Sequence, residues 1–287
     1  MSSTCERRWA TRRWARGCGR TWRRGAVAER VISSTCGFSV VFMSGFVYLV
    51  VVAWTWGYGW VVHLFDVGVI GLAGSGIVHL TRGVSAVAGT VVLGPRNGRW
   101  TNPEEPDPHN LPLVMLGTFI LWFGWYGFNC GSTLGMDAAT CKLTAHVAMK
   151  TTIAAATGGI VVFFLRSAIY RYCDVSGLCN GILAGLMSIT ASRGNVESSS
   201  ALSIGFVGAF VCQLASMLLR KRKIDNTVDA VPVHGACGIW GVIAAVIFDM
   251  GLDKGHFHGW SGFSCMTTDG GDCQEGLSSD ASQHASS

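Results

Sequence analysis

The sequence has few charged residues. Aspartate, glutamate, lysine and arginine make up 14% of the 287 residues, where a soluble domain averages about 25%. In addition, 49% of the residues are hydrophobic, which is more apolar surface than one core of this length can shield from water. This composition argues against a soluble enzyme, a disordered chain and a nucleic-acid-binding module, and it indicates a protein that is solvated by lipid.

Charges are missing altogether from long stretches of the chain. A bilayer core of about 30 Å takes ~20 residues of helix, and seven stretches approach or exceed that length. They are approximately 36–56, 69–94, 111–132, 145–170, 177–192, 200–219 and 231–249. The alternating ten-residue segments of a membrane β-barrel are absent. The sequence therefore predicts an all-α membrane protein, a polytopic helical bundle with about seven transmembrane helices over residues 36–250.

Positive charge is scarce on one side of the predicted membrane. Only three lysines or arginines fall in the connections on that side, against seventeen on the side that includes the N-terminal segment and the turn near Arg166 and Arg171. Two more, Arg82 and Lys150, lie deep within spans. Because cytoplasmic loops carry the positive excess, we expect a cytoplasmic N-terminus and an outer tail over residues 251–287.

The first 35 residues contain nine arginines and no lysine. Such a segment can lie on an anionic leaflet, act as a targeting sequence, or be an unstructured extension. No sustained helical face joins its arginines and tryptophans, so we interpret residues 1–35 as a disordered cytoplasmic extension. Nucleic-acid binding is not expected, because no basic surface continues after Arg30.

No C-x-x-C pair occurs among the eleven cysteines, so neither a zinc site nor a redox motif is predicted. Most of the cysteines are expected to act as small apolar residues. Cys265 and Cys273 lie in the polar, glycine- and serine-rich outer tail, where an oxidising compartment would permit a disulfide. We predict no catalytic residues, no metal and no cofactor.

Two histidines lie well inside predicted spans. An ionisable group within the membrane is costly and usually functional. His79 and His234 share the pattern H-x-x-x-G, which places Gly83 and Gly238 one helical turn beyond the imidazole. Small residues let helices approach closely. A single such histidine would be read as a neutral group bonded to a carbonyl, but the repeated context predicts that the two imidazoles meet within the membrane.

Four aromatic residues alternate with glycine near the end of the third span, in the run Phe123–Ser132. The run is compatible with an aromatic belt at the outer interface. It is also compatible with rings that project into a cavity, where the face of an aromatic ring attracts a cation by about 1–2 kcal/mol. Trp56 lies at the outer end of the first span, on the same side.

Together these stretches resemble the ammonium transporter, methylammonium permease and Rhesus family. Four segments in order carry the resemblance, which extends from about Phe46 to Phe248. They are Gly74–His79 (GSGIVH), Gly124–Ser132 (GWYGFNCGS), Asn180–Leu186 (NGILAGL) and Asp225–Gly235 (DNTVDAVPVHG). The resemblance implies a partial ammonium-transporter fold, a trimer with one pore per protomer, and transport of ammonium or ammonia across the plasma membrane.

The resemblance also implies roles for individual residues. The pore residues would be His79, His234 and Phe128. The residues that recruit the cation would be Trp56, Ser132 and Trp125. Structural support would come from Asp225, Asp229 and Asn129.

The residue types suit this chemistry. Ammonium has four N–H donors and a charge, so hydroxyl oxygens and ring faces can recruit it. An intact cation pays a large desolvation penalty in an apolar constriction. Loss of a proton outside, with passage as ammonia beside two imidazoles, avoids that penalty. Potassium has no proton to lose and would be rejected.

The chain also departs from the family pattern. We expect the first three of some eleven spans, and the last, to be missing, and the arginine-rich start has no counterpart in the resemblance. Gly71 stands where the family has a buried carboxylate, while Arg82 and Lys150 add positive charge to the helices. Two alternatives therefore stay open. The chain could be a non-conducting partner that inhibits full-length subunits in mixed trimers, or a membrane cytochrome with two axial histidines.

The orientation can be tested by labelling. Residues after Gly251 are predicted to react with impermeant thiol reagents in intact cells, through Cys265 or Cys273. Reaction only after permeabilisation would show that the number of spans or the orientation is wrong.

Overall fold

A computed structural model describes residues 30–31, 33–57, 59–61, 74–101, 110–133, 138–192 and 196–248. The predicted outer tail 251–287, Gly71 and most of the predicted extension 1–35 lie outside these residues.

The described part of the chain is helical and contains no strand, which confirms the predicted fold class. The first segment consists of α2 (Ser33–Phe42), the π-helical turn η1 (Met43–Val47) and α3 (Tyr48–Trp54), and the second of η3 (Ser75–Leu80) and α4 (Thr81–Leu93). The others are α5 (Leu111–Gly131), α6 (Ala138–Tyr170), α7 (Val175–Ile189), α8 (Ser198–Lys221), and η4 (Val231–Ala236) with α9 (Cys237–Ile247).

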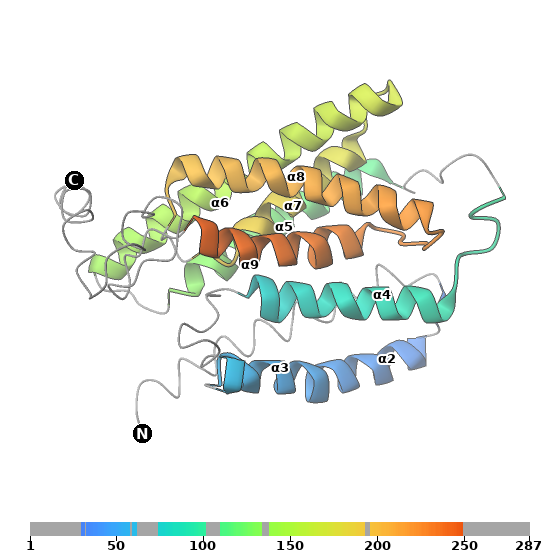
Figure 1. Cartoon of the computed structure of the whole chain (residues 1–287), viewed down its shortest axis with the longest axis horizontal. Helices are drawn as coiled ribbons and strands as arrows, with labels where there is room; N and C mark the ends of the chain where they lie inside the picture. The colour runs from blue at the N-terminus through green and yellow to red at the C-terminus, as the bar shows by residue number, and fades with distance from the viewer. Residues whose placement is uncertain are drawn as a thin grey trace, which may run out of the picture.

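These segments correspond one to one with the seven predicted stretches. Five are long and apolar enough to cross a membrane, whereas Val175–Ile189 and Val231–Ile247 are shorter apolar helices. The fourth segment begins at Ala138, about two turns earlier than predicted, because the polar residues at its start continue the same helix. Successive segments run in opposite directions (Figure 1), as expected for a polytopic bundle.

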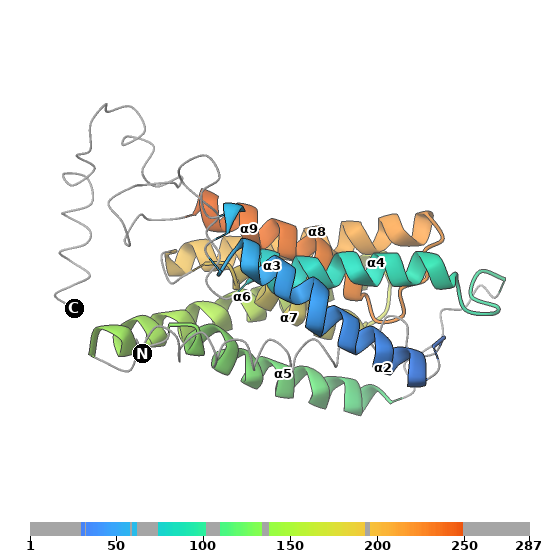
Figure 2. The same cartoon turned by 90° about the horizontal axis from the view of Figure 1, so that it is seen from below.

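The helices α6, α7 and α8 pack closely on one another, and α5 packs on α6 and α7. On another side, α4 packs on η4 and α9 packs on η3. Figure 2 shows α5 on one side of the bundle and α8 and α9 on the other. The first segment contacts the others mainly through α3, whose Val52 is buried against Ile77 and Val78 of η3.

The outer surface of the bundle is apolar. Phe38 on α2, Val92 on α4 and Phe123 on α5 are 77%, 84% and 79% exposed, which water would disfavour at about 25 cal/mol per Å². By contrast, α7 is buried along almost its whole length. An apolar exterior around a packed centre is the arrangement that lipid solvation favours, and the chain is an integral multi-pass membrane protein.

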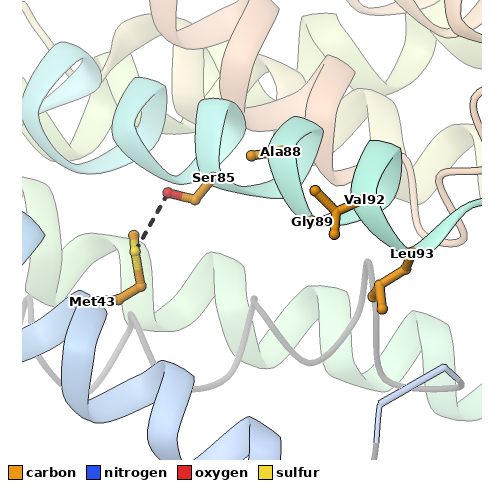
Figure 3. A pocket seen from close by; sticks show the side chains of 6 residues that line it. All are labelled: Met43, Ser85, Ala88, Gly89, Val92 and Leu93. Carbon is orange, nitrogen blue, oxygen red and sulfur yellow. Dashed lines mark hydrogen bonds between the residues drawn. The ribbon is translucent and has the colours of Figure 1, made fainter.

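A shallow groove of about 330 Å³ lies between η1 and α4. Figure 3 shows its lining, which consists of Met43, Ser85, Ala88, Gly89, Val92 and Leu93. The Ser85 hydroxyl lies 3.7 Å from the Met43 sulfur, which it contacts across the groove. The groove contains none of the predicted site residues.

Arg166 corrects an expectation. The sequence counted it with the turn at the end of the predicted span 145–170, but it lies inside α6, is 5% exposed, and forms an ion pair with Asp174 at 2.8 Å. The other Asp174 carboxylate oxygen accepts a hydrogen bond from the Gly177 amide and caps α7. The Asp174 carboxylate thus neutralises a buried arginine of α6 and caps the start of α7. This double contact joins the two helices.

Three arginines surround the carboxylate of Asp225 at one end of the bundle. Arg96 donates to it through Nε at 2.8 Å and through its backbone amide at 3.0 Å, and Arg99 Nε lies 3.4 Å away. Arg30 donates to the carbonyl oxygens of Gly94 and Asp225. We call these four charged residues the Asp225 clasp. It joins the residue before the first helical segment to the end of α4 and the connection before η4.

The clasp makes stability depend on pH. Burial raises the pKa of Asp225, but hydrogen bonds from Arg96 and the charges of Arg96 and Arg30 outweigh this and hold the pKa below 3.8. The folded state therefore binds the proton more weakly than the unfolded state. This contribution to stability is complete above the unfolded pKa and is lost as the pH falls through the lower folded pKa.

We predict that Asp225→Asn lowers the free energy of unfolding by about 3 kcal/mol, because it leaves the arginines without their shared carboxylate. The measurement is thermal unfolding of the purified protein at neutral pH. Arg222→Gln is the control, since it removes an exposed charge that lies outside the clasp. Equal losses for the two variants would contradict the role of the clasp.

Candidate functional site: a buried histidine pair

His79 and His234 meet in the interior of the bundle. Their Nδ1 atoms are 3.2 Å apart, and the ring centroids are 5.4 Å apart with planes 23° from parallel. His79 is 0% exposed and His234 is 1% exposed. The predicted contact between the two imidazoles is therefore confirmed. One ring donates through Nδ1 and the other accepts, according to the tautomers present.

Both histidines lie in π-helical turns at the start of their segments. His79 belongs to η3 and His234 to η4, and each turn continues into an α-helix. A π-turn inserts an extra residue into the helix and is frequent at functional sites. The sequence analysis did not predict these turns, and we identify no sequence signal that would have revealed them.

Glycines allow the two segments to approach. A Cβ at Gly83 would lie 2.2 Å from the Gly235 Cα, and a Cβ at Gly238 would lie 3.0 Å from the Leu80 amide nitrogen. Leu80 faces Gly238, and Gly83, three residues later, faces Gly235, three residues earlier. The two segments therefore cross in antiparallel directions. The glycine of each H-x-x-x-G pattern thus packs beside the histidine of the other segment. This explains why the pattern occurs twice.

Two aromatic rings from α5 cover His79. Trp125 stacks on the imidazole with centroids 5.3 Å apart, and Phe128 lies 5.7 Å away. Trp125 is 3% exposed, and its indole Nε1 donates to the Thr190 hydroxyl on α7 at 3.0 Å. The structure places Trp125 beside His79, and its hydrogen bond to Thr190 joins α5 to α7.

The other predicted recruiting residues lie near Phe128. Trp56 packs in the same apolar cluster as Phe128, Val52 and Val78. Ser132 follows Phe128 by one turn of α5, and its hydroxyl donates to the Phe128 carbonyl at 2.7 Å. Trp56, Phe128 and His79 therefore follow one another from the end of α3 into the bundle.

The three predicted supporting residues occupy different places. Asp225 lies in the clasp. Asp229 accepts hydrogen bonds from Ser216 Oγ at 3.0 Å and Asn180 Nδ2 at 3.2 Å, just before η4. Asn129 donates through Nδ2 to Thr151 Oγ1 on α6 at 3.1 Å. Asp229 thus joins α7 and α8 to the segment that carries His234, and Asn129 joins α5 to α6.

Arg82 on α4 and Lys150 on α6 lie within helices, as the sequence indicated. Arg82 acts electrostatically on both imidazoles. Lys150 on α6 is 6% exposed, and the negative charge of Glu197 acts on it. A fixed positive charge near the histidine pair opposes the presence of a second cation there.

The two histidines can pass a proton from one ring to the other through their Nδ1 contact. Among the described residues, no three histidine, cysteine or acidic side chains cluster as metal ligands. His79 Nε2 is buried and has no hydrogen-bond partner in that part of the chain. Such a nitrogen is a place where a small polar molecule can donate or accept a hydrogen bond.

We predict that Gly83→Ala lowers the free energy of unfolding by about 2 kcal/mol, because the added methyl group meets the Gly235 backbone and pushes the two segments apart. Thermal unfolding of purified protein measures the change. Gly117→Ala on α5 is the matched control: its Cβ would meet nothing within 4 Å, and alanine favours the helix. If both variants unfold at the wild-type temperature, the close approach is not needed.

The chain is similar to ammonium transporters over most of its length. Residues 20–269 match the model of the Ammonium Transporter Family. Ammonium transporter 1 member 3 of Solanum lycopersicum is 38% identical over 241 residues, and ammonium transporter Amt2 of Archaeoglobus fulgidus is 38% identical over 234. Each alignment covers 78% of this chain and, respectively, 52% and 49% of the relative.

Solved structures agree. The crystal structure of Saccharomyces cerevisiae Mep2 matches with a TM-score of 0.75 at 32% identity, covering 82% of this chain and 52% of that one. The crystal structure of Candida albicans Mep2 matches with a TM-score of 0.77 at 30% identity, covering 86% and 55%. The chain spans about half the length of these relatives.

The family model matches more of the chain than the family resemblance that was read from the sequence, which extends from about Phe46 to Phe248. The match begins at residue 20, so part of the arginine-rich start, which had no counterpart in the resemblance, lies within the family match. The family model matches most of the residues, the relatives reach 38% identity, and the fold is that of solved members. The chain therefore belongs to the ammonium transporter family.

Proposed function

We propose that the chain forms a conduction path for ammonium and ammonia whose central element is the histidine pair. The observation that carries the proposal is the direct contact of two buried imidazoles, Nδ1 to Nδ1 at 3.2 Å, beneath two aromatic rings. Two neutral imidazoles in an apolar interior need a functional reason, because each buries polar atoms that water would otherwise solvate.

The proposed path begins at Trp56 and Ser132. The ring face of Trp56 attracts the cation, and the Ser132 hydroxyl accepts one of its N–H bonds. Phe128 then separates this outer region from His79. Ammonium gives up its proton to water on the outer side of this boundary, and ammonia continues beside the imidazoles.

Selectivity follows from the same arrangement. Ammonia donates and accepts hydrogen bonds, so the ring nitrogens can serve it in either sense. Potassium keeps its charge and would have to leave its hydration shell among apolar and aromatic side chains. Arg82 adds to this barrier, because its charge acts on both imidazoles.

We propose further that the chain alone conducts weakly. The reason is the positive charge of Arg82, which acts on both imidazoles and opposes entry of the cation. The proposed working form is a homotrimer, or a mixed trimer with full-length family members, in the plasma membrane. A second candidate function is inhibition of full-length subunits in such a mixed trimer, which the positive charge of Arg82 beside the histidine pair favours.

The geometry of the histidine pair argues against a cytochrome. In a haem protein with two axial histidines, the iron and the porphyrin plane lie between the two rings. Here the Nδ1 atoms are in direct contact and the rings lie nearly parallel, 5.4 Å apart, so no porphyrin fits between them.

The test is expression in a yeast strain that lacks its own ammonium permeases, on low ammonium. We expect weak growth that is lost in His234→Ala, while Arg82→Gln raises uptake up to about tenfold, the effect of ~1.4 kcal/mol less repulsion. A full-length family member is the positive control, and membrane abundance is measured for each variant.

The outcomes separate the two candidates. Strong growth that requires His234 would establish a working transporter and contradict weak conduction. No growth, with reduced uptake when the chain is co-expressed with a full-length member, would favour the inhibitory partner. Growth that survives His234→Ala would remove the histidine pair from the mechanism.

A further inference from the structure

Asn129 has a buried acceptor that no donor serves. The residue is 3% exposed. Its Nδ2 donates to Thr151 Oγ1 at 3.1 Å, and the Thr151 hydroxyl donates in turn to the Val147 carbonyl at 2.7 Å. Because the Thr151 proton is already used, the amide must present Nδ2 to Thr151, which fixes the direction of Oδ1.

Asn129 Oδ1 then has no hydrogen-bond partner in the described chain, although it is buried. A buried acceptor without a donor costs about 1–3 kcal/mol, and such groups are rare enough to require an explanation. An apolar side chain of the same shape would avoid the cost. The amide is therefore expected to meet a donor that comes from outside the described chain.

The position of Asn129 indicates which donor. Trp125, Phe128, Asn129 and Ser132 are spaced i, i+3, i+4 and i+7 and lie on one face of α5. Trp125 and Phe128 contact His79, while Ser132 lies at the end of the helix. Asn129 therefore lies between the proposed recruiting hydroxyl and the histidine pair.

We infer that Asn129 Oδ1 accepts a hydrogen bond from ammonium between Ser132 and His79. The inference rests on the proposed function and adds a binding residue to it. Ammonium suits the position because one N–H bond serves the lone acceptor while neighbouring ring faces attract the charge. Potassium has no N–H bond and needs several oxygens at once, which one amide cannot supply.

Binding can be measured without transport. The purified full chain is unfolded thermally in sodium, potassium, tetramethylammonium or ammonium chloride at one ionic strength. Ammonium is expected to raise the unfolding temperature by about 2–4 °C over sodium. Potassium and tetramethylammonium, which lacks N–H donors, are expected to give no rise.

Asn129→Leu is expected to abolish the ammonium-dependent rise, because it removes the acceptor. It also removes the bond to Thr151, so the rise is measured against the unfolding temperature of the same variant in sodium. Thr118→Val is the matched control. Thr118 is also buried on α5 and donates to the Val114 carbonyl, so its replacement should keep the rise. Asn129→Asp keeps the acceptor but, like the leucine variant, gives up the Nδ2 bond to Thr151. It is expected to keep the rise, which assigns the loss in Asn129→Leu to the acceptor and not to a folding defect.

A rise that persists in Asn129→Leu, or that is lost equally in Thr118→Val, would overturn the inference. If ammonium does not raise the unfolding temperature of the wild type, the inference is also overturned, because water alone then serves Asn129 Oδ1. The growth assay would still decide the transport function. A rise specific to Asn129 in a chain that supports no growth would support binding and count against conduction.

Discussion

The close crossing of two antiparallel segments is the constraint on which the site depends. Gly83 of α4 meets the backbone beside His234, and Gly238 of α9 meets the backbone beside His79. Without side chains at these points the backbones come near enough for the two imidazoles to touch at 3.2 Å. In lipid, where apolar surface gives helices little reason to associate, such close packing is what holds them together.

Around this crossing, polar groups are paired and placed so that the interior stays apolar. Trp125 is held by Thr190, Asp174 pairs with Arg166, and Asp229 accepts from Ser216 and Asn180. Each bond joins two different segments. Because an unpaired polar group in hydrocarbon costs several kcal/mol, these contacts fix the relative positions of the helices as well as satisfying their own atoms.

Charge is distributed differently at the end of the bundle and in its centre. The Asp225 clasp concentrates Arg30, Arg96 and Arg99 on one carboxylate outside the spans. Among the helices, Arg82 adds a positive charge that acts on both imidazoles, and Gly71 stands in the sequence where the family resemblance implies a carboxylate. Both features would raise the potential that a cation meets, and they are the physical basis of the weak conduction that we propose.

Much of the architecture was readable from the sequence. Long gaps between charges located all seven helical segments, because a helix in lipid must be apolar along its length. The repeated H-x-x-x-G pattern indicated that His79 and His234 meet, since small residues one turn from each imidazole permit close packing. Arg82 and Lys150 were likewise identified as charges within helices.

Tertiary structure alone decided which neighbours these residues have. An apolar helix shows little contrast between its faces, so the sequence did not reveal that Trp125 turns inward to Thr190, that Arg166 finds Asp174, or that Arg30 reaches Asp225. The π-turns that carry both histidines also depend on packing between segments far apart in the chain. The sequence by itself determined which residues enter the membrane, because that depends on each segment's own transfer from water to lipid, whereas the site depends on contacts that exist only after the segments assemble.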